Sequence, residues 1–216
     1  MKTEGLMITI ITAAWNAEGV WNAIRSIDNQ TYKNWHHIIV NDNNPDVRKA
    51  LHAMCAHEKR MYIDIGFRTH FYGALARNMG AISAFSYVHH SKRDIENEWV
   101  TFHDDDNRWE PWHLEDMVAA KLANPDASII ATDAMWVGAK DKKWIQHRPI
   151  KLKHGSCDLG QFMYKTRLFR DYGYFFPHPR RKHKWDWELI KKMTKGEKGA
   201  IAYTNKPSFI MNYKKR

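Results

Sequence analysis

Residues 99–112, with the sequence WVTFHDDDNRWEPW, decide which fold this chain can adopt. The first four are β-forming residues and predict a strand. Three adjacent carboxylates follow, Asp104, Asp105 and Asp106, and because neighbouring anions repel each other we expect a counter-charge close to them. Pro111 then predicts the start of a helix, since proline is favoured at a first helical position.

This stretch alone allows two interpretations. A strand that ends in clustered acids and leads into a helix suits a hard divalent cation, which prefers oxygen ligands. A solvated acidic turn in front of a helix accounts for the same residues equally well. The rest of the chain has to decide between them.

The length and charge of the chain limit its class. With 216 residues it is expected to form one domain with ample chain to bury a core. Lys and Arg outnumber Asp and Glu by 34 to 24, which favours either simple solubility or an anionic partner such as a nucleotide phosphate or an acidic membrane surface. The basic residues cluster late in the chain, at 180–184, 191–192 and 214–216.

The cysteine content and the apolar runs indicate a compartment. Cys55 and Cys157 are far apart and show no metal-ligand spacing, which favours a reducing environment over a disulfide scaffold. No apolar run approaches the ~20 residues that cross a bilayer, and the N-terminal apolar run is more typical of a buried strand than of a signal peptide. We expect a cytoplasmic protein, with the basic C-terminal segment as a candidate for peripheral membrane contact.

The first 133 residues alternate between strand-like apolar runs and amphipathic helices. Besides the strand at 99–102, we expect strands at 6–13, 35–41, 62–67 and 128–132, and helices at 17–29 and starting near 44, 73 and 111. This alternation predicts a mainly parallel sheet covered by helices on both faces.

Polar residues follow three of these expected strands. Asn16 comes after the first strand, Asp42 after the second, and the three acids after the strand at 99–102. Because ligands of parallel sheets bind at the carboxyl ends of the strands, these groups are expected to meet at one edge. That expectation favours a binding crevice over a solvated acidic turn.

The pattern changes after Asp133. We expect an antiparallel hairpin at 136–147 turning around Lys140 and Asp141, a glycine-punctuated stretch at 155–163, helices at 165–172 and 185–195, and strands at 200–203 and 209–213. We interpret the chain as one domain in which residues 1–133 form a nucleotide-binding half and residues 134–216 an acceptor-side half, following the rule that ligands bind where the strand order reverses.

Four segments, in order, carry a resemblance. They are SIDNQTYKNWHHIIVND at 26–42, GALARNMGAISA at 73–84, VTFHDDDNRWEPWHLE at 100–115 and WDWEL at 185–189. Together they resemble the motifs of glycosyltransferase family two over nearly the whole chain. One such motif is weak, but four in the family's order and spacing are specific. The resemblance implies a GT-A α/β fold and transfer of a sugar, with inversion, from a nucleotide-sugar donor to an acceptor hydroxyl.

The resemblance also implies roles for single residues on the donor side. Residues matching the family's donor nucleotide-binding positions are Thr12, Ala13, Asn16, Asp42, Arg77, Asp104 and Asp105. Asp42 corresponds to the acid that accepts a hydrogen bond from the base, typically uracil, so a UDP-linked donor is expected. Asp105 is also explained as a hydrogen-bonding spacer between its neighbours.

Metal, base and acceptor positions follow in the same way. Asp104 and Asp106 match the ends of the family's Asp-x-Asp motif, which implies a bound Mn²⁺ or Mg²⁺, and Asp186 matches the catalytic base. Trp185 is a candidate acceptor-facing ring. Asp158, in the glycine-punctuated stretch, is a candidate for contact with a sugar, although a turn role explains it as well.

The sequence departs from the family pattern at two positions. Asn41 replaces the first acid of a Val-Asp-Asp segment, beside the expected base site. Trp185 replaces the acid that precedes the catalytic base, which bears on the choice of acceptor. A glycan, a lipid-linked sugar or another hydroxyl compound fits the sequence equally well as acceptor.

Two rival functions are less well supported. A sugar nucleotidyltransferase would need a glycine-rich, lysine-bearing loop after the first strand, and residues 13–16 (AAWN) contain none. A basic nucleic-acid-binding module would show a helix-turn-helix or an aromatic ribonucleoprotein motif, and neither is present. We therefore expect no nucleic-acid partner.

Overall fold

The computed structural model describes residues 5–54, 57–67, 73–90, 93–138, 145–176, 185–204 and 206–213. Its strands are β1 (Met7–Ala14), β2 (Trp35–Asn41), β3 (Arg60–Asp64), β4 (Glu98–Phe102), β5 (Asn107–Trp109), β6 (Ile129–Ala131), β7 (Ala134–Gly138), β8 (Ile145–Arg148), β9 (Phe162–Lys165), β10 (Ile201–Tyr203) and β11 (Phe209–Tyr213). Its α-helices are α1 (Ala17–Asp28), α2 (Pro45–Met54), α3 (Ala74–His90), α4 (His113–Ala123), α5 (Arg167–Tyr172) and α6 (Trp185–Gly196), and two short 3₁₀-helices are η1 (Ile95–Asn97) and η2 (Leu159–Gln161).

The larger of two sheets has seven strands in the order β10-β6-β9-β4-β1-β2-β3. Strands β1, β2, β3 and β4 are parallel to one another, and β10 is parallel to β6, whereas β9 runs antiparallel between β4 and β6. The predicted mainly parallel α/β sheet is therefore confirmed. The smaller sheet has the order β5-β11-β7-β8.

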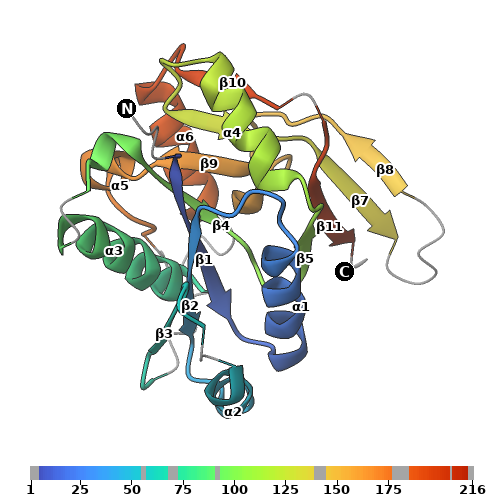
Figure 1. The fold of residues 1–216 in the computed structure, drawn as a ribbon. Helices are drawn as coiled ribbons and strands as arrows, with labels where there is room; N and C mark the ends of the chain where they lie inside the picture. The colour runs from blue at the N-terminus through green and yellow to red at the C-terminus, as the bar shows by residue number, and fades with distance from the viewer. Residues whose placement is uncertain are drawn as a thin grey trace.

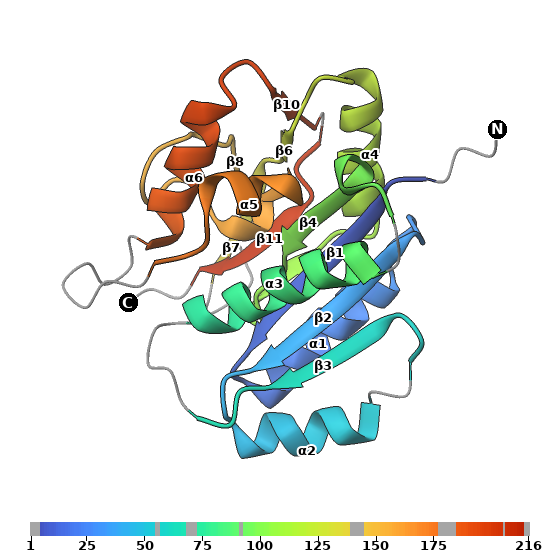
Figure 2. The ribbon, with the colours of Figure 1, turned by 90° about the vertical axis from the view of Figure 1, so that its left-hand side faces the viewer.

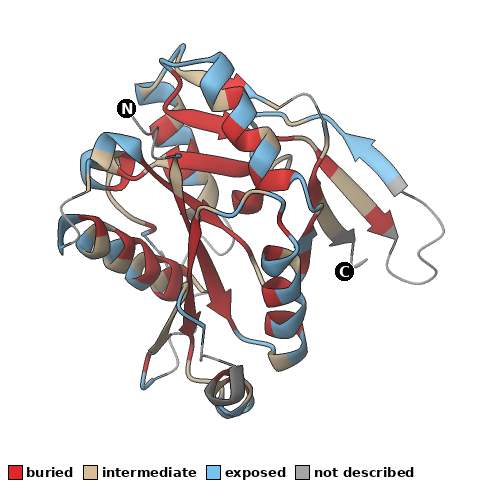
Figure 3. Ribbon diagram, viewed as in Figure 1, coloured by how far each residue is buried: buried red, intermediate tan, exposed pale blue. Residues whose placement is uncertain are grey.

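Helices cover both faces of the larger sheet (Figures 1 and 2). Helices α3, α5 and α6 pack on one face, where their apolar residues share a core cluster with alternate residues of the sheet. Helices α1, α2 and α4 cover the other face. Strands β1, β2 and β4 are buried along nearly their whole length, as Figure 3 shows, which fits the apolar run of β1 and the apolar residues in the middle of β2 and β4.

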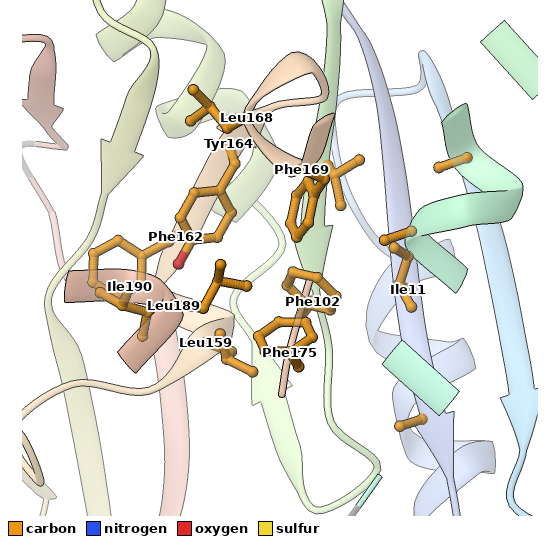
Figure 4. Close-up of a cluster of buried hydrophobic side chains, with 14 of the residues drawn as sticks. Ile11, Phe102, Leu159, Phe162, Tyr164, Leu168, Phe169, Phe175, Leu189 and Ile190 are labelled. Carbon is orange, nitrogen blue, oxygen red and sulfur yellow. The ribbon is translucent and has the colours of Figure 1, made fainter. Parts of the chain in front are cut away.

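The core on the α3–α5–α6 face is rich in aromatic rings (Figure 4). The Phe102 ring lies 5.3 Å from that of Phe175 and 5.8 Å from that of Phe169, both in edge-to-face geometry. Burying each such ring stabilises the fold by about 1.5–3 kcal/mol. Since Phe102 ends β4 immediately before the acidic stretch, this core fixes the strand end that carries the acids.

Several predicted boundaries were wrong, among them that of the helix expected at 165–172, which begins at Arg167 because Phe162–Lys165 form β9. Helix α4 begins at His113 rather than at Pro111, because Pro111 and Trp112 form the turn that leads into it. The third strand covers Arg60–Asp64 rather than 62–67, because the chain turns away from β2 after Asp64. The hairpin of β7 and β8 is confirmed as antiparallel, although its turn lies outside the described residues.

Strands β5 and β9 were not predicted. Strand β9 begins at the end of the glycine-punctuated stretch, and packing explains the glycine at 160. A Cβ atom there would come within 2.4 Å of the Phe209 ring and 3.2 Å of the Phe102 carbonyl oxygen. Glycine therefore lets the chain pass between the two sheets. Through β9, β10 and β11, residues after 133 contribute to both sheets.

In the described part of the chain, no helix is both long enough and apolar enough to cross a membrane.

Candidate functional site

Three parallel strands bring the predicted polar groups to one edge of the larger sheet. Ala14 at the end of β1 pairs with Asn41 at the end of β2, and the carbonyl oxygen of Ala14 accepts the N–H of Asp42 at 3.2 Å. At the end of β4, the N–H of His103 donates to the carbonyl oxygen of Ile11 in β1 at 2.9 Å. The loops after β1, β2 and β4 therefore leave the sheet side by side.

The three consecutive acids at this edge have different surroundings. Asp104 forms an ion pair with Arg77 of α3. Asp105 accepts hydrogen bonds from the backbone of the β1–α1 loop, and Asp106 is exposed. The expected counter-charge is thus supplied by Arg77, at least for the first acid.

Arg77 is a buried cation at the start of α3, with 7 % of its surface exposed. Burial lowers the pKa of its guanidinium, but the Asp104 carboxylate more than offsets this, and Asp158 and Asp186 add to the rise. Gly73 leaves room for the side chain, because a Cβ atom there would approach a guanidinium nitrogen of Arg77 to 2.8 Å. Arg77 therefore lies within the field of three carboxylates from three separate segments.

Asp158 caps the short helix η2. Its Oδ1 accepts the N–H of Gly160 at 3.0 Å, and its own backbone N–H donates to Oε1 of Gln161 at 2.9 Å. The turn role weighed from the sequence is confirmed. Burial raises the pKa of Asp158 to about 7, and the Asp104 carboxylate contributes next, so this acid also lies in the site's field.

Asp186 lies in the first turn of α6 and is partly buried. Its Oδ1 accepts the N–H of Trp187 at 2.7 Å. The apolar residues Leu189, Ile190 and Met193 hold α6 against the sheet. The side chain of Trp185 lies outside the described part of the structure, so its predicted acceptor contact stays a prediction.

A polar network surrounds Asn41 at the end of β2, the residue that departs from the family pattern. Asn41 is buried, and its amide donates to the backbone oxygen of Asn44 at 3.1 Å and to Asp64 at 3.3 Å. Asp64 in turn pairs with Arg48 of α2. The amide can donate where an acid could not, which accounts for asparagine at this position. Asp42 beside it is buried.

Thr12 and Ala13 lie in β1 rather than in the loop after it. The Thr12 hydroxyl is buried against the imidazole Nε2 of His37 at 2.9 Å, on the α1 side of the sheet. Ala13 faces the opposite side of the sheet. There, a Cβ atom added to Gly73 would lie 3.1 Å from the Cβ of Ala13. Their predicted donor contacts stay predictions.

Sequence reasoning missed two asparagines that organise the site. The Asn44 amide donates to the carbonyl oxygen of Trp15 at 2.6 Å, linking the loops after β1 and β2. The Asn78 side chain donates to the carbonyl oxygen of Phe175 at 2.8 Å and accepts its N–H at 2.9 Å. In the sequence, Asn78 belongs to the segment GALARNMGAISA and Asn44 marks a helix start, but neither pattern indicates which residue the side chain contacts.

The residues present fit a divalent cation. Among the described residues there is no ready cluster of three or more His, Cys, Asp or Glu with metal-binding geometry. Acidic side chains nevertheless outnumber basic ones here. Arg77 pairs with Asp104 and lies in the field of Asp158 and Asp186, and Asp106 is exposed in the same turn as Asp104. Carboxylate oxygens are the donors that Mg²⁺ and Mn²⁺ prefer. The pKa of Asp158 is raised first by burial and then by the Asp104 carboxylate, so a cation placed here would meet negative charge that Arg77 alone does not offset.

Comparison with solved structures shows the fold. TarS from S. aureus, residues 1–349, superposes with a TM-score of 0.71 at 15 % identity, covering 95 % of this chain and 60 % of that one. The same protein in complex with UDP gives 0.71 at 16 % identity, covering 96 % and 60 %. A mannosyltransferase from Pyrobaculum calidifontis, in complex with GDP-Man and Mn²⁺, gives 0.61 at 13 % identity, covering 95 % and 58 %.

This chain thus spans about 60 % of the length of the TarS fragment that it matches. No curated protein sequence matches the chain. The family model described as "Glycosyl transferase family 2" matches residues 9–190, which is most of the chain and includes every acid of the site. Together with the GT-A type of fold, this match shows that the chain belongs to glycosyl transferase family 2.

Proposed function

We propose that this chain transfers a sugar from a UDP-linked donor to an acceptor hydroxyl, with inversion at the anomeric carbon and with the help of a divalent cation. One observation carries the proposal. The loops after β1, β2 and β4 meet at one sheet edge, where Arg77 lies in the field of the Asp104, Asp158 and Asp186 carboxylates. Membership of glycosyl transferase family 2 supports sugar transfer as the reaction at that edge.

The donor side rests on the loops after β1 and β2. Asp42 is buried at the end of β2, where it would accept a hydrogen bond from the base, and Arg77 would face the nucleotide's phosphates. The TarS structure with UDP supports a uracil nucleotide. The mannosyltransferase carries GDP-Man, so guanine is the competing base in any test.

Asp104 and Asp106 would hold the Mn²⁺ or Mg²⁺. When bound, such a cation acts as a Lewis acid that neutralises the charge developing on the leaving diphosphate. Mn²⁺ in the mannosyltransferase complex supports this part of the proposal. The pKa of Asp158 is raised to about 7, so a nearby cation would favour the ionised form of this carboxyl group.

Asp186 is the proposed general base. It takes the proton of the acceptor hydroxyl while the hydroxyl oxygen attacks the anomeric carbon from the face opposite the diphosphate. The carbon–oxygen bond to the diphosphate breaks, and the nucleoside diphosphate leaves with the bonding electrons. The acceptor is a hydroxyl compound such as a glycan or a lipid-linked sugar, and Trp185 is the proposed acceptor-facing ring.

We also propose that the protein works in the cytoplasm, with peripheral membrane contact through its basic C-terminal segment. The support is compositional: two distant cysteines, of which Cys157 is a free thiol, and the cluster at 214–216, which lies outside the described residues.

A thermal-shift panel tests the function most directly. The wild-type protein is melted with UDP, GDP and their hexose conjugates, with Mn²⁺ or with EDTA. A ligand that binds only the folded state raises the melting temperature, and a concentration of 100 times Kd stabilises by about 2.7 kcal/mol. We expect the largest shift with UDP compounds and Mn²⁺, and loss of the Mn²⁺-dependent part in Asp106→Asn. Asp126→Asn, a change of an exposed loop acid, is the matched control.

If no nucleotide or nucleotide sugar shifts the melting temperature with either additive, the proposed function is wrong. If binding occurs but Asp106→Asn retains the full Mn²⁺ effect, only the metal assignment is wrong.

A further inference from the structure

One side-chain oxygen links the acidic turn after β4 (residues 104–106) to the loop after β1 (residues 15–16). Oδ2 of Asp105 accepts hydrogen bonds from the N–H of Trp15 at 2.8 Å and from the N–H of Asn16 at 2.7 Å. Hydrogen bonds from N–H to a carboxylate are among the stronger ones in proteins. The two segments are about ninety residues apart in sequence, so this contact depends entirely on the tertiary fold.

The same loop is held from its other side as well. The carbonyl oxygen of Trp15 accepts a hydrogen bond from the Asn44 amide at 2.6 Å. Oδ1 of Asn16 accepts the N–H of Glu18 at 3.0 Å and thereby caps α1. The Trp15 peptide groups therefore have a fixed orientation between the acidic turn and the loop after β2.

Gly19 supports the contact sterically. A Cβ atom at this position would lie 2.1 Å from the carbonyl oxygen of Asp105. The first turn of α1 therefore packs directly against the backbone of the acidic turn. Any side chain at 19 would have to push the two segments apart.

We propose that Asp105 is a positioning residue, which holds the Trp15–Asn16 segment in the conformation that receives the donor's base without itself touching the donor. This rests on the proposed function, which places the base beside that segment. The proposal gives the three adjacent acids different roles. Asp104 and Asp106 act on Arg77 and the proposed metal, and Asp105 connects the metal-binding turn to the segment that receives the nucleobase. Binding of the nucleobase then depends on Asp105, a residue of the metal motif, even when no metal is present.

The contact itself is tested by amide hydrogen exchange, which requires no ligand. In Asp105→Ala, exchange at residues 15–19 is expected to become at least about tenfold faster than in wild type, because the acceptor is lost. Asp105→Asn keeps one acceptor oxygen and is expected to exchange within about threefold of wild type. Asp126→Ala removes an exposed carboxylate elsewhere and should leave this segment unchanged.

The consequence for binding is tested by titrating the same variants with UDP and GDP in EDTA. Asp105→Ala should bind the nucleotide preferred by wild type about tenfold more weakly, whereas Asp105→Asn should stay within about threefold. Gly19→Ala should weaken binding as Asp105→Ala does, because it separates the same two segments while all three acids remain. These EDTA measurements exclude loss of metal as the cause.

Unchanged exchange at residues 15–19 in Asp105→Ala would overturn the contact. Faster exchange with unchanged nucleotide affinity would overturn the positioning role, as would an Asp105→Asn variant as weak as Asp105→Ala. If wild type itself binds no nucleotide, the proposed function fails together with the donor role of Asp105, and the exchange result still reports separately whether Asp105 holds the loop.

Discussion

At the scale of single residues, the three adjacent acids Asp104, Asp105 and Asp106 have three different surroundings. Their position after a strand and their need for a counter-charge were predictable from residue type. Their three different directions were not, because the direction of a side chain beyond a strand end depends on partners far away in the sequence. Arg77 and the Trp15 backbone, which bind two of the three, come from other segments of the fold.

Asp186 is the residue whose replacement should separate chemistry from binding. Asp186→Asn removes the proposed proton acceptor but retains the size of the side chain, so we expect kcat to fall about 10²–10⁴-fold. The affinity for the donor should change less than about threefold. Release of UDP from a UDP-sugar, with water or an added glycan as acceptor, measures the rate, and titration calorimetry measures donor affinity. An active Asp186→Asn variant would exclude this residue as the base.

His37 makes folding dependent on pH. Its imidazole is fully buried beside the Thr12 hydroxyl, and burial lowers its pKa well below 6.5. The charged or titratable groups that face it and lower the pKa further are Arg60, His103 and His36. Folded His37 is therefore neutral, while the unfolded chain binds a proton once the pH falls below its ordinary pKa. The stability is fully present above that pKa and is lost as the pH falls through it.

We expect His37→Gln to lose less stability than wild type between about pH 7.5 and about pH 5, because each unit of pKa depression corresponds to about 1.4 kcal/mol. Urea unfolding of both proteins at both pH values measures the difference. Asp105 and Asp158, whose raised pKa values act in the opposite direction, are the same in both proteins and cancel. An equal pH dependence in the two proteins would contradict the assignment.

At the scale of secondary-structure elements, the buried parallel strands and the amphipathic helices were predictable. The bounds of β2 were predicted correctly, and those of β1 and α1 to within one residue, because an apolar run or a helical period defines each of them. Strands β5 and β9 were missed. Each is only 3 or 4 residues long, and what makes them strands is pairing with distant partners rather than any local pattern.

Helix α3 illustrates how closely an element can approach the sheet. A Cβ atom on Gly80 would lie 2.4 Å from Cγ2 of Ile11 in β1. Gly80→Ala improves helix propensity, but the overpacking against a fully buried isoleucine should dominate and lower the free energy of unfolding by about 1–3 kcal/mol. Chemical denaturation measures this. Gly66→Ala, where nothing lies within 4 Å of the added atom, is the control and should change stability far less.

At the scale of the whole molecule, the two expected halves share their sheets. Strand β9 lies between β4 and β6, and β10 pairs with β6 on its other side. A fragment of residues 1–133 therefore leaves β6 without either neighbour and β4 with an open edge. We expect this fragment to lack the cooperative thermal unfolding of the full chain, measured by near-ultraviolet circular dichroism. A fragment that melts cooperatively and binds UDP would show that the first half is an independent unit.

The position of β11 also has a consequence for synthesis. This strand pairs with both β5 and β7, yet the ribosome makes it well after both of them. During translation the nascent chain therefore exposes strand edges that have no partner until residues 209–213 emerge. Such edges can pair with other chains, so binding by a chaperone would protect the smaller sheet until its last strand is made.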